Sequence, residues 1–538
     1  MPFWRRHRLT LRPDNKPDQE SGNRSDVNTK KPESGGETVE GPDARDLQER
    51  LAWYQRELDL CSDVIYRQFV LSTGQECALI YLRGMISQPT VQNFILRSLQ
   101  KRAEELKEGD IFKFLFDDKG LDVSQNKLVT DMNEGLNAVL DAGALLLIDG
   151  DHRMMTFSIS DYPTRSVSEA PNESVIRGPR EAFIEDLEIN LTLLRRRLKN
   201  KDFKCEELKF GTKTKSSVVV AFVQGVAKPE MIAEVKRRLS YIDIDGIMGA
   251  SYLEESIEDN PYSPFPQMQY SERPDVIAAS LLEGRIALMV DGTPLVLLVP
   301  VTMTMLLQSA EDYYQRFVAA TWIRWIRYFF LFASLLLPSL YIATTTFHPE
   351  MIPSQLLYTL AASREIVPFP ALLEAFIMEI AFEALREASI RIPKAIGQAV
   401  SIIGALIIGT AAVEAGIVSA AMVIIVSLTG IASFIIPHFD LGLSFRLLRF
   451  PIMFLAAMFG LYGIACGLIL IYTHLTNLKS FGVPYLAPIA PLVKDDLKDT
   501  LVRAPWWHMR TRPPFMAGNK IRQQNKSRDW AKKKGEGN

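Results

Sequence analysis

The chain has 538 residues, of which 47% are hydrophobic and 23% are charged, and its formal net charge is −2 at pH 7. This length exceeds one ordinary domain, and the near-neutral balance without any nucleic-acid-reading motif predicts no nucleic-acid partner. The four cysteines form no CxxC pair and the six histidines never pair at ligand spacing. We therefore expect no disulfide framework, no metal site, no cofactor and a reducing compartment for the soluble half.

The first 46 residues predict a disordered N-terminal arm, because residues 13–45 are rich in Pro, Gly, Ser, Asn, Asp and Lys and nearly lack large apolar side chains. A first small α/β subdomain is expected over residues 47–164. Its predicted elements are a helix from Leu47, a strand Cys77–Leu82, a helix Pro89–Lys107, a strand Ala144–Ile148 and a returning strand Arg153–Ile159.

The same order of elements recurs about 141 residues later, since the strand Val218–Val223 follows Cys77–Leu82 at that offset. Gly225 then stands where Gly84 stood, a helix runs from Pro229 to Leu239, and Asp291-Gly292 repeats the turn Asp149-Gly150. The pattern predicts an internal duplication, with a second α/β subdomain over residues 209–308.

Residues 165–208 are expected to link the two subdomains through one amphipathic helix from Pro179 to Lys199. Acidic residues gather near its start and basic residues near its end, which complements the helix dipole. One stripe of this helix is apolar: Phe183, Leu187, Leu191, Leu194 and Leu198. The stripe is expected to pack on its own domain; a subunit contact or a mechanical link between the two subdomains is the alternative.

A polytopic all-α transmembrane domain is expected over residues 309–480, before a basic C-terminal tail at 481–538. Four stretches approach the ~20 apolar residues that a bilayer demands: Tyr328–Phe347, Ala395–Val413, Ile417–Ile436 and Phe450–Thr473. The segment 371–391 is a fifth candidate, so four or five helices are predicted. Arg316, Arg324 and Arg327 precede the first crossing and favour a cytoplasmic N-terminal region.

The segment 371–391 carries several acids within an apolar helix pattern. Glu379, Glu383 and Glu387 lie four residues apart and share one face, and Glu374 lies one turn before them. Three such carboxylates in lipid would cost on the order of 8–10 kcal/mol. Either this helix lines a wet cation pathway, with Glu414 at its mouth, or it lies along the membrane surface with its acids in water.

Small residues are closely spaced in the second apolar stretch. Gly397, Ser401, Gly404 and Gly409 predict close helix packing in lipid; a narrow pore wall is the alternative.

The positive-inside rule is not satisfied everywhere by the predicted crossings. If 371–391 and Phe450–Thr473 both cross, the basic tail falls outside.

Several separate motifs resemble the GerA family of spore germination proteins, and the A subunit in particular. They are Glu173–Glu181 with Arg195–Lys199, Asn260–Pro266, Glu272–Asp275, Gly284–Pro294, the helix Glu374–Glu387, and Pro437–Gly442 with Arg446. The resemblance covers about residues 50–505 and keeps the motifs in order.

The resemblance implies a multi-pass subunit of a nutrient germinant receptor in the inner membrane of a bacterial endospore, with its N-terminal region on the spore-core side. It implies a permease-like B subunit and a lipoprotein C subunit as partners. It also implies a homo-oligomer, suspected to be a pentamer, that conducts monovalent cations. A ring would gather the acid face of every subunit around one axis, a cation-selective lining.

Other functions remain open on the residues alone. A channel like stage V sporulation protein AF, which amplifies germination, shares the same architecture. A cation-coupled secondary transporter could use the acid face, but no inverted repeat is seen in the membrane block. A membrane enzyme is not expected, because no phosphate-binding loop, nucleophile elbow or catalytic cluster is found.

Overall fold

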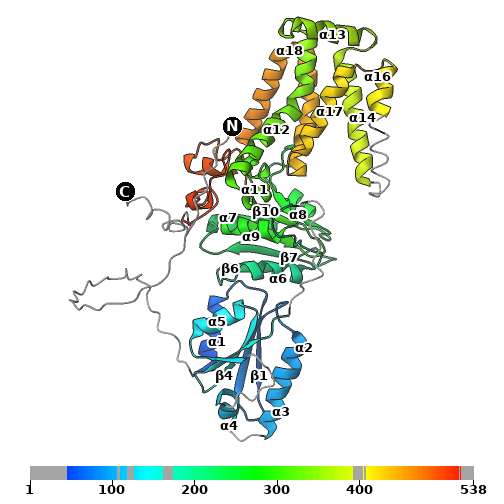
Figure 1. Cartoon of the computed structure of the whole chain (residues 1–538). Coiled ribbons are helices and arrows are strands. Elements are labelled where there is room, and N and C mark those ends of the chain that lie inside the picture. Colours follow the sequence, from blue (N-terminus) through cyan, green and yellow to red (C-terminus); the bar gives the residue numbers. More distant parts are fainter. Residues whose placement is uncertain are drawn as a thin grey trace, which may run out of the picture. The chain divides into compact units, whose positions relative to one another are not determined.

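The structure, a computed structural model, describes residues 45–105, 110–117, 126–161, 173, 175–391, 404, 407–519 and 521–522. Nearly all of the expected N-terminal arm, together with Gly397 and Ser401, lies outside the described residues. Along the chain, two α/β units are followed by a bundle of long helices (Figure 1).

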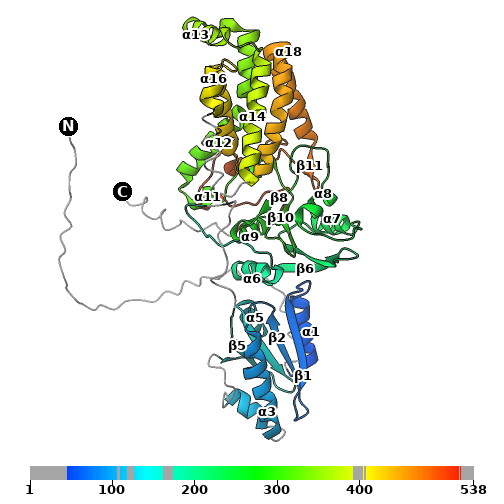
Figure 2. The ribbon, with the colours of Figure 1, turned by 90° about the vertical axis from the view of Figure 1, so that its right-hand side faces the viewer.

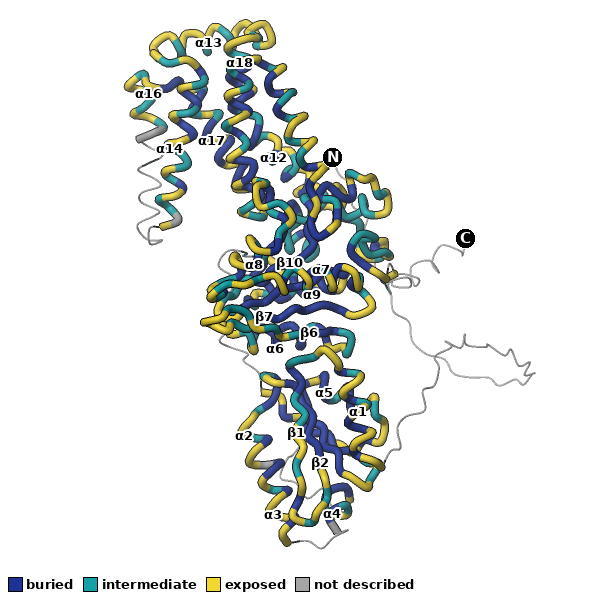
Figure 3. Tube along the Cα trace, turned by 180° about the vertical axis from the view of Figure 1, so that it is seen from behind, coloured by how far each residue is buried: buried dark blue, intermediate teal, exposed yellow. Residues whose placement is uncertain are grey.

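The first unit is built on a five-stranded antiparallel sheet with the strand order β1-β2-β4-β5-β3. Its strands are β1 (Val64–Val70), β2 (Glu76–Leu82), β3 (Asn126–Val129), β4 (Gly143–Ile148) and β5 (Met154–Ser158). Its helical segments are α1 (Leu47–Glu57), α2 (Gln88–Thr90), η1 (Val91–Leu96), α3 (Arg97–Glu105), α4 (Asp110–Phe112), η2 (Lys113–Asp117) and α5 (Met132–Leu140). Strands β2 and β4 are almost wholly buried because both faces of the sheet are covered (Figure 3).

The second unit repeats this plan in a sheet with the order β6-β7-β9-β10-β8. Its strands are β6 (Phe203–Phe210), β7 (Ser216–Val223), β8 (Gln269–Ser271), β9 (Ile286–Val290) and β10 (Val296–Val299). Its helices are α6 (Leu187–Arg197), α7 (Pro229–Leu239), α8 (Ala250–Ile257) and α9 (Pro274–Leu282). Apolar clusters again cover both faces of the sheet. Figure 2 shows the helices and strands of this unit in a second view.

The strands of the predicted duplication are confirmed. Cys77 pairs with Ile148 in the first sheet, and Val218 pairs with Val290 at the corresponding position of the second. The turn glycines also correspond, since Gly84 has φ +74° and Gly225 has φ +75°. These left-handed values favour glycine, which has no Cβ to clash.

The helix predicted to begin at Pro179 is shorter than expected. Helix α6 begins at Leu187, because Asp186 is its N-cap and accepts a hydrogen bond from Ile189 N at 3.0 Å. Phe183 therefore lies outside the helix, although it is buried with Leu194 in the same apolar cluster. The expected linker 165–208 also includes the start of β6, so α6 and β6 are both part of the second unit.

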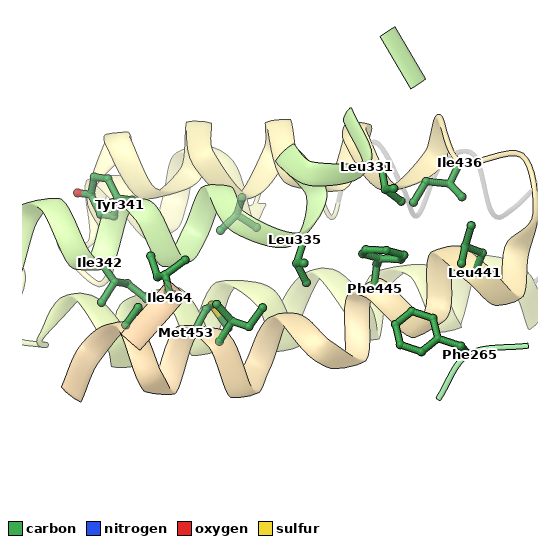
Figure 4. Packing of buried hydrophobic residues seen from close by; sticks show 14 of the residues in the cluster. Phe265, Leu331, Leu335, Tyr341, Ile342, Ile436, Leu441, Phe445, Met453 and Ile464 are labelled. Atoms are coloured by element: carbon green, nitrogen blue, oxygen red, sulfur yellow. The ribbon is translucent and has the colours of Figure 1, made fainter. Parts of the chain in front are cut away.

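The third part of the chain is helical. After α10 (Met303–Leu306) and α11 (Glu311–Tyr314), its helical segments are α12 (Phe317–Thr346), η3 (Pro349–Met351), α13 (Ser354–Glu365), α14 (Ala371–Arg391), η4 (Ile407–Ala411), α16 (Ala412–Glu414), α17 (Ala420–Phe434) and α18 (Phe439–Asn477). Among the described residues, α12 and α18 are long and apolar enough to cross a membrane. Side chains of α12, α17 and α18 share one buried core (Figure 4).

Helix α18 is folded back on itself at Gly460, whose φ of +61° and ψ of −140° are not helical. A Cβ on Gly463 would lie 2.1 Å from the backbone oxygen of Leu455, and one on Gly467 would lie 3.4 Å from Ile452. Such contacts are impossible along a straight helix with a rise of 1.5 Å per residue. The segment Phe450–Thr473, predicted as one helix, is therefore interrupted at Gly460: residues 439–459 and 461–477 form an antiparallel pair.

The C-terminal segment contributes to the folded core. It contains β11 (Lys479–Ser480), β12 (Val483–Pro484), η5 (Lys494–Asp499) and η6 (Trp506–His508). Phe481, Val483 and Met516 are buried in an apolar cluster of the second sheet. The described part of the expected basic tail is thus packed against the second α/β unit.

Candidate functional site

The acid face on α14 runs from a buried end to an exposed end. The Glu379 side chain is 1% exposed, Glu383 is 30% exposed and Glu387 is 61% exposed. The four-residue spacing keeps them on one face of the helix. Each of the three carboxylates contacts at least one arginine, so in this conformation the acid face is electrostatically compensated.

Glu379 forms an ion pair with Arg449, which lies in the first half of α18 and is 2% exposed. Arg449 Nε also donates to the backbone oxygen of Ser334 on α12 at 2.8 Å. This one guanidinium therefore joins α12, α14 and α18. The attraction within such a buried ion pair offsets the free-energy cost of removing both charges from water only when the hydrogen-bond geometry is good.

Glu383 contacts two arginines from different helices. Arg386 Nη1 donates to it at 3.0 Å, and Arg446 Nη1 lies 3.6 Å from its second oxygen. Arg386 Nη2 also donates to Ser433 Oγ of α17 at 2.9 Å. Glu387 pairs with Arg391 on its own helix. We call these contacts of Glu379, Glu383 and Glu387 the charge ladder.

The two other acids of the predicted pathway lie apart from the charge ladder. Glu374 is fully buried and accepts hydrogen bonds from the backbone N and Oγ of Ser419, the N-cap of α17. Glu414 is exposed on α16, which lies near α13 and away from the C-terminal end of α14 (Figure 1). Glu374 therefore anchors α17, and among the described residues no ion pair or hydrogen bond joins Glu414 to the charge ladder.

Of the small residues predicted to mediate packing, two are described and they differ. A Cβ on Gly404 would lie 2.5 Å from Cδ2 of Leu385 on α14, whereas one on Gly409 would meet nothing within 4 Å. Gly430 of α17 provides a similar approach, with a Cβ position 2.5 Å from the Phe382 ring. Two segments thus approach α14 closely through glycine.

The proline-rich segment Asn260–Pro266 contacts both halves of α18. The Phe265 ring is 2% exposed, and its centroid lies 5.8 Å from that of Phe445 and 6.0 Å from that of His474 (Figure 4). Ser263 Oγ is hydrogen-bonded to His474 Nε2 at 2.8 Å, and Ser444 Oγ donates to the backbone oxygen of Pro264. We call Asn260–Gln269 the coupling loop, because it joins the second α/β unit to the bundle.

His438 extends this contact immediately before α18. Its Nε2 lies 3.1 Å from Gln269 Nε2, and Arg285 Nη1 donates to Gln269 Oε1 at 2.9 Å. Burial, then the charges of Arg285 and Arg327, lower the pKa of His438 to about 4. The imidazole is therefore neutral near pH 7 and can accept a hydrogen bond from the Gln269 amide.

A second contact brings together the sequence motifs Glu173–Glu181 and Glu272–Asp275. Arg273 is 2% exposed and donates to the backbone oxygens of Glu173 at 3.2 Å and Pro179 at 3.1 Å. Ser271 Oγ donates to the Glu173 carboxylate at 2.8 Å. These motifs are distant in sequence, so their pairing was not predictable from their spacing.

The arginines predicted to mark the cytoplasmic boundary also have buried partners. Arg324 and Arg327 both donate to Asp312 at 3.0 Å, and Arg324 Nη1 lies 3.0 Å from Asp499 in the C-terminal segment. Neither Asp312 nor Asp499 belongs to a spaced motif, so sequence reasoning did not find them. Within the described residues, no cluster of His, Cys, Asp and Glu is placed to hold a metal ion.

Two antiparallel α/β units joined to a bundle of long apolar helices define a membrane-associated protein with a large polar N-terminal half. The sequence matches the family described as Bacillus/Clostridium GerA spore germination protein over residues 52–515. The chain belongs to this family, which confirms the resemblance of its motifs.

Curated relatives match along most of their length. The chain is 47% identical over 461 residues to the uncharacterized membrane protein YfkQ of Bacillus subtilis, covering 85% of this chain and 89% of that protein. It is 41% identical over 480 residues to spore germination protein KA of the same organism, covering 89% of this chain and 88% of that protein. Spore germination protein A1 of Bacillus subtilis is 38% identical over 459 residues, covering 85% of this chain and 94% of that protein.

One solved structure is also similar: the crystal structure of the N-terminal domain of the A subunit of the Bacillus megaterium spore germinant receptor GerK3. It is 30% identical, with a TM-score of 0.38, and the alignment covers 47% of this chain and 94% of that domain.

Proposed function

We propose that this chain is the A-type subunit of a nutrient germinant receptor in the inner spore membrane. In this role it assembles with a permease-like B subunit and a lipoprotein C subunit, and oligomerises around a pathway for monovalent cations. The observation that carries the proposal is family membership over residues 52–515, together with relatives named as spore germination proteins.

The fold at Gly460 supports a multi-pass topology with both ends of the chain on the spore-core side. If α12, α14, the predicted stretch Ala395–Val413, α17 and both halves of α18 all cross, there are six crossings and Gly460 lies on the far side. Arg324, Arg391, Arg446 and the tail then lie on the core side, as the positive-inside rule requires. Phe450–Thr473 taken as one crossing would instead leave the basic tail on the far side.

The charge ladder supports a closed, charge-compensated conformation of the proposed pathway. Glu379 is buried with Arg449, whereas Glu383 is partly exposed and bound by arginines of two helices. Opening would require arginines to leave the carboxylates, so that cations could replace them. Glu383 is the acid of the ladder that we expect to bind the ion inside the pathway, since it lies between the exposed Glu387 and the buried Glu379.

The test is electrical recording from membranes that contain the assembled receptor, with Glu383→Gln compared against Glu365→Gln, an exposed glutamate of α13. We expect unitary cation-selective steps, with selectivity weakened by Glu383→Gln and unchanged by Glu365→Gln. Saturable solute exchange without unitary steps would instead support a carrier. Spores that lack this chain yet germinate normally on every nutrient would contradict the receptor role.

A further inference from the structure

Cys61 and Cys205 face each other across an isolated parallel β-bridge between the two α/β units. Two hydrogen bonds fix this bridge: Ser62 N donates to the Cys205 oxygen at 2.9 Å, and Cys205 N donates to the Leu60 oxygen at 3.1 Å. Neighbouring strands lie about 4.7–4.9 Å apart, inside the range of about 4.4–6.8 Å that Cα atoms of a disulfide span. The backbone therefore already has the spacing that a disulfide needs.

The two thiols differ in access to solvent. Cys205 is fully buried, whereas Cys61 is partly exposed. Because the Cys61 side chain is partly exposed, a small oxidant can approach its thiol, and the buried Cys205 is its partner in the bridge. This is the arrangement of an oxidisable cysteine beside a resolving one.

The surroundings favour the thiolate of the outer cysteine. Arg195 forms a buried bidentate pair with Asp63 at 2.7 and 2.9 Å, and its Nη2 lies 3.4 Å from Cys205 Sγ. The Cys205 thiol, and then the Arg195 charge, lower the pKa of Cys61 below that of a free thiol. Because the thiolate is the reactive form, Cys61 reacts before Cys77, whose pKa burial raises to about 12.

We propose that Cys61 and Cys205 form a modification site at which a hydroperoxide makes a disulfide joining the two α/β units. The Cys61 thiolate attacks a peroxide oxygen, giving a sulfenic acid and hydroxide. Cys205 then attacks that sulfur; the S–S bond forms and the second oxygen leaves as water. For hydrogen peroxide, two thiols are oxidised and two waters are produced.

The junction tolerates this reaction because its main ion pair does not depend on the thiols. Cys205 Sγ donates a hydrogen bond to Asp63 Oδ1 at 3.0 Å, and oxidation removes that donor. Asp63 keeps both hydrogen bonds from Arg195. Oxidation also removes the hydrogen bond that Cys61 Sγ donates to the Phe203 oxygen at 3.6 Å. Two weak hydrogen bonds are lost, and a covalent link forms between the segment before β1 and strand β6.

The experiment treats the purified full-length protein with hydrogen peroxide, blocks remaining thiols with N-ethylmaleimide and maps peptides by mass spectrometry without reduction. We expect a Cys61–Cys205 linked peptide and a mass loss of about 2 Da. In Cys205→Ser, dimedone should trap the Cys61 sulfenic acid. In Cys61→Ser, we expect peroxide to modify Cys205 at least about tenfold more slowly. The extent of oxidation of Cys77 and Cys466 in the same sample is the internal control.

A second readout in the wild-type chain is independent of whether the variants fold. Amide exchange of Ser62, whose N–H crosses the bridge, should slow after oxidation and recover after reduction with dithiothreitol. The proposal is overturned if Cys61 and Cys205 remain reduced while Cys466 is oxidised. It is equally overturned if the linked peptide forms only after the protein has been unfolded.

Discussion

Arg449 pairs with Glu379 inside the helical bundle, and neither side chain is more than 2% exposed. The pair lies where α14, α18 and α12 meet, since Arg449 also holds the Ser334 oxygen. Each charge can be buried there only because the other is present. Removing one partner would leave the other as a buried charge without a counter-charge. The pair therefore couples three helices that are distant in sequence.

Glu379→Gln should destabilise the bundle by about 3–5 kcal/mol, because it leaves Arg449 buried without a counter-charge. The measurement is the thermal midpoint of the detergent-solubilised full-length protein. The double variant Glu379→Leu with Arg449→Leu should recover most of the loss, since it removes both charges. Glu387→Gln is the matched control and should change stability by less than about 1 kcal/mol, as its pair is exposed. Equal effects of Glu379→Gln and Glu387→Gln would contradict the assignment.

Gly404→Leu should weaken packing against α14, because even a Cβ would lie 2.5 Å from the Leu385 side chain. The loss of stability should be about 1–3 kcal/mol, the usual cost of overpacking, and assembly in detergent should decrease. Leu385→Ala in the same chain should relieve the clash. Gly409→Leu is the control, because its Cβ position is open. Normal oligomers and an unchanged midpoint for Gly404→Leu would argue against this contact.

The sequence predicted local structure well where hydrophobic periodicity and turn residues agree, as at Cys77–Leu82 and Val218–Val223. It failed at Gly460, because a glycine within an apolar run is common in membrane helices and gives no sign of a reversal. The partner of Glu379 was missed as well, because Arg449 directly precedes the crossing that was predicted to begin at Phe450.

Contacts between distant segments had no signal in the sequence. Cys61 and Cys205 form no CxxC pair, and the sequence shows only how far apart they are along the chain, not that they are neighbours in space. The acid face itself was visible because it lies on one helix, where spacing fixes direction. Its compensation by Arg446 and Arg449 depends on how helices pack, which periodicity does not specify.

Phe265→Ala should disconnect the coupling loop from α18. The ring is 2% exposed between Phe445 and His474, so its removal should cost about 3–5 kcal/mol. Tyr262→Ala, in the same loop but 97% exposed, is the control and should have little effect. Hydrogen exchange of residues 260–269 and 439–445 in the full-length protein is the measurement. If both variants exchange like the wild type, the loop does not depend on this ring.

Glu173→Gln should change how stability depends on pH. Burial raises the pKa of Glu173 from 4.5 to about 7, against the opposing hydrogen bonds from Ser271 and Glu272. The folded state therefore holds a proton between pH 4.5 and 7 that the unfolded state releases, so this group's contribution to stability falls as pH rises through that window.

Glutamine keeps an oxygen for Ser271 Oγ without carrying a charge, so Glu173→Gln should be more stable than the wild type at pH 8, by about 1–2 kcal/mol after allowing for partial exposure. The difference should disappear near pH 5, where the wild-type carboxyl is protonated in the folded state. Thermal midpoints of the full-length protein between pH 5 and 8 measure this, with the exposed Glu185→Gln as control. A constant difference across that range would show that the carboxyl of Glu173 does not titrate there.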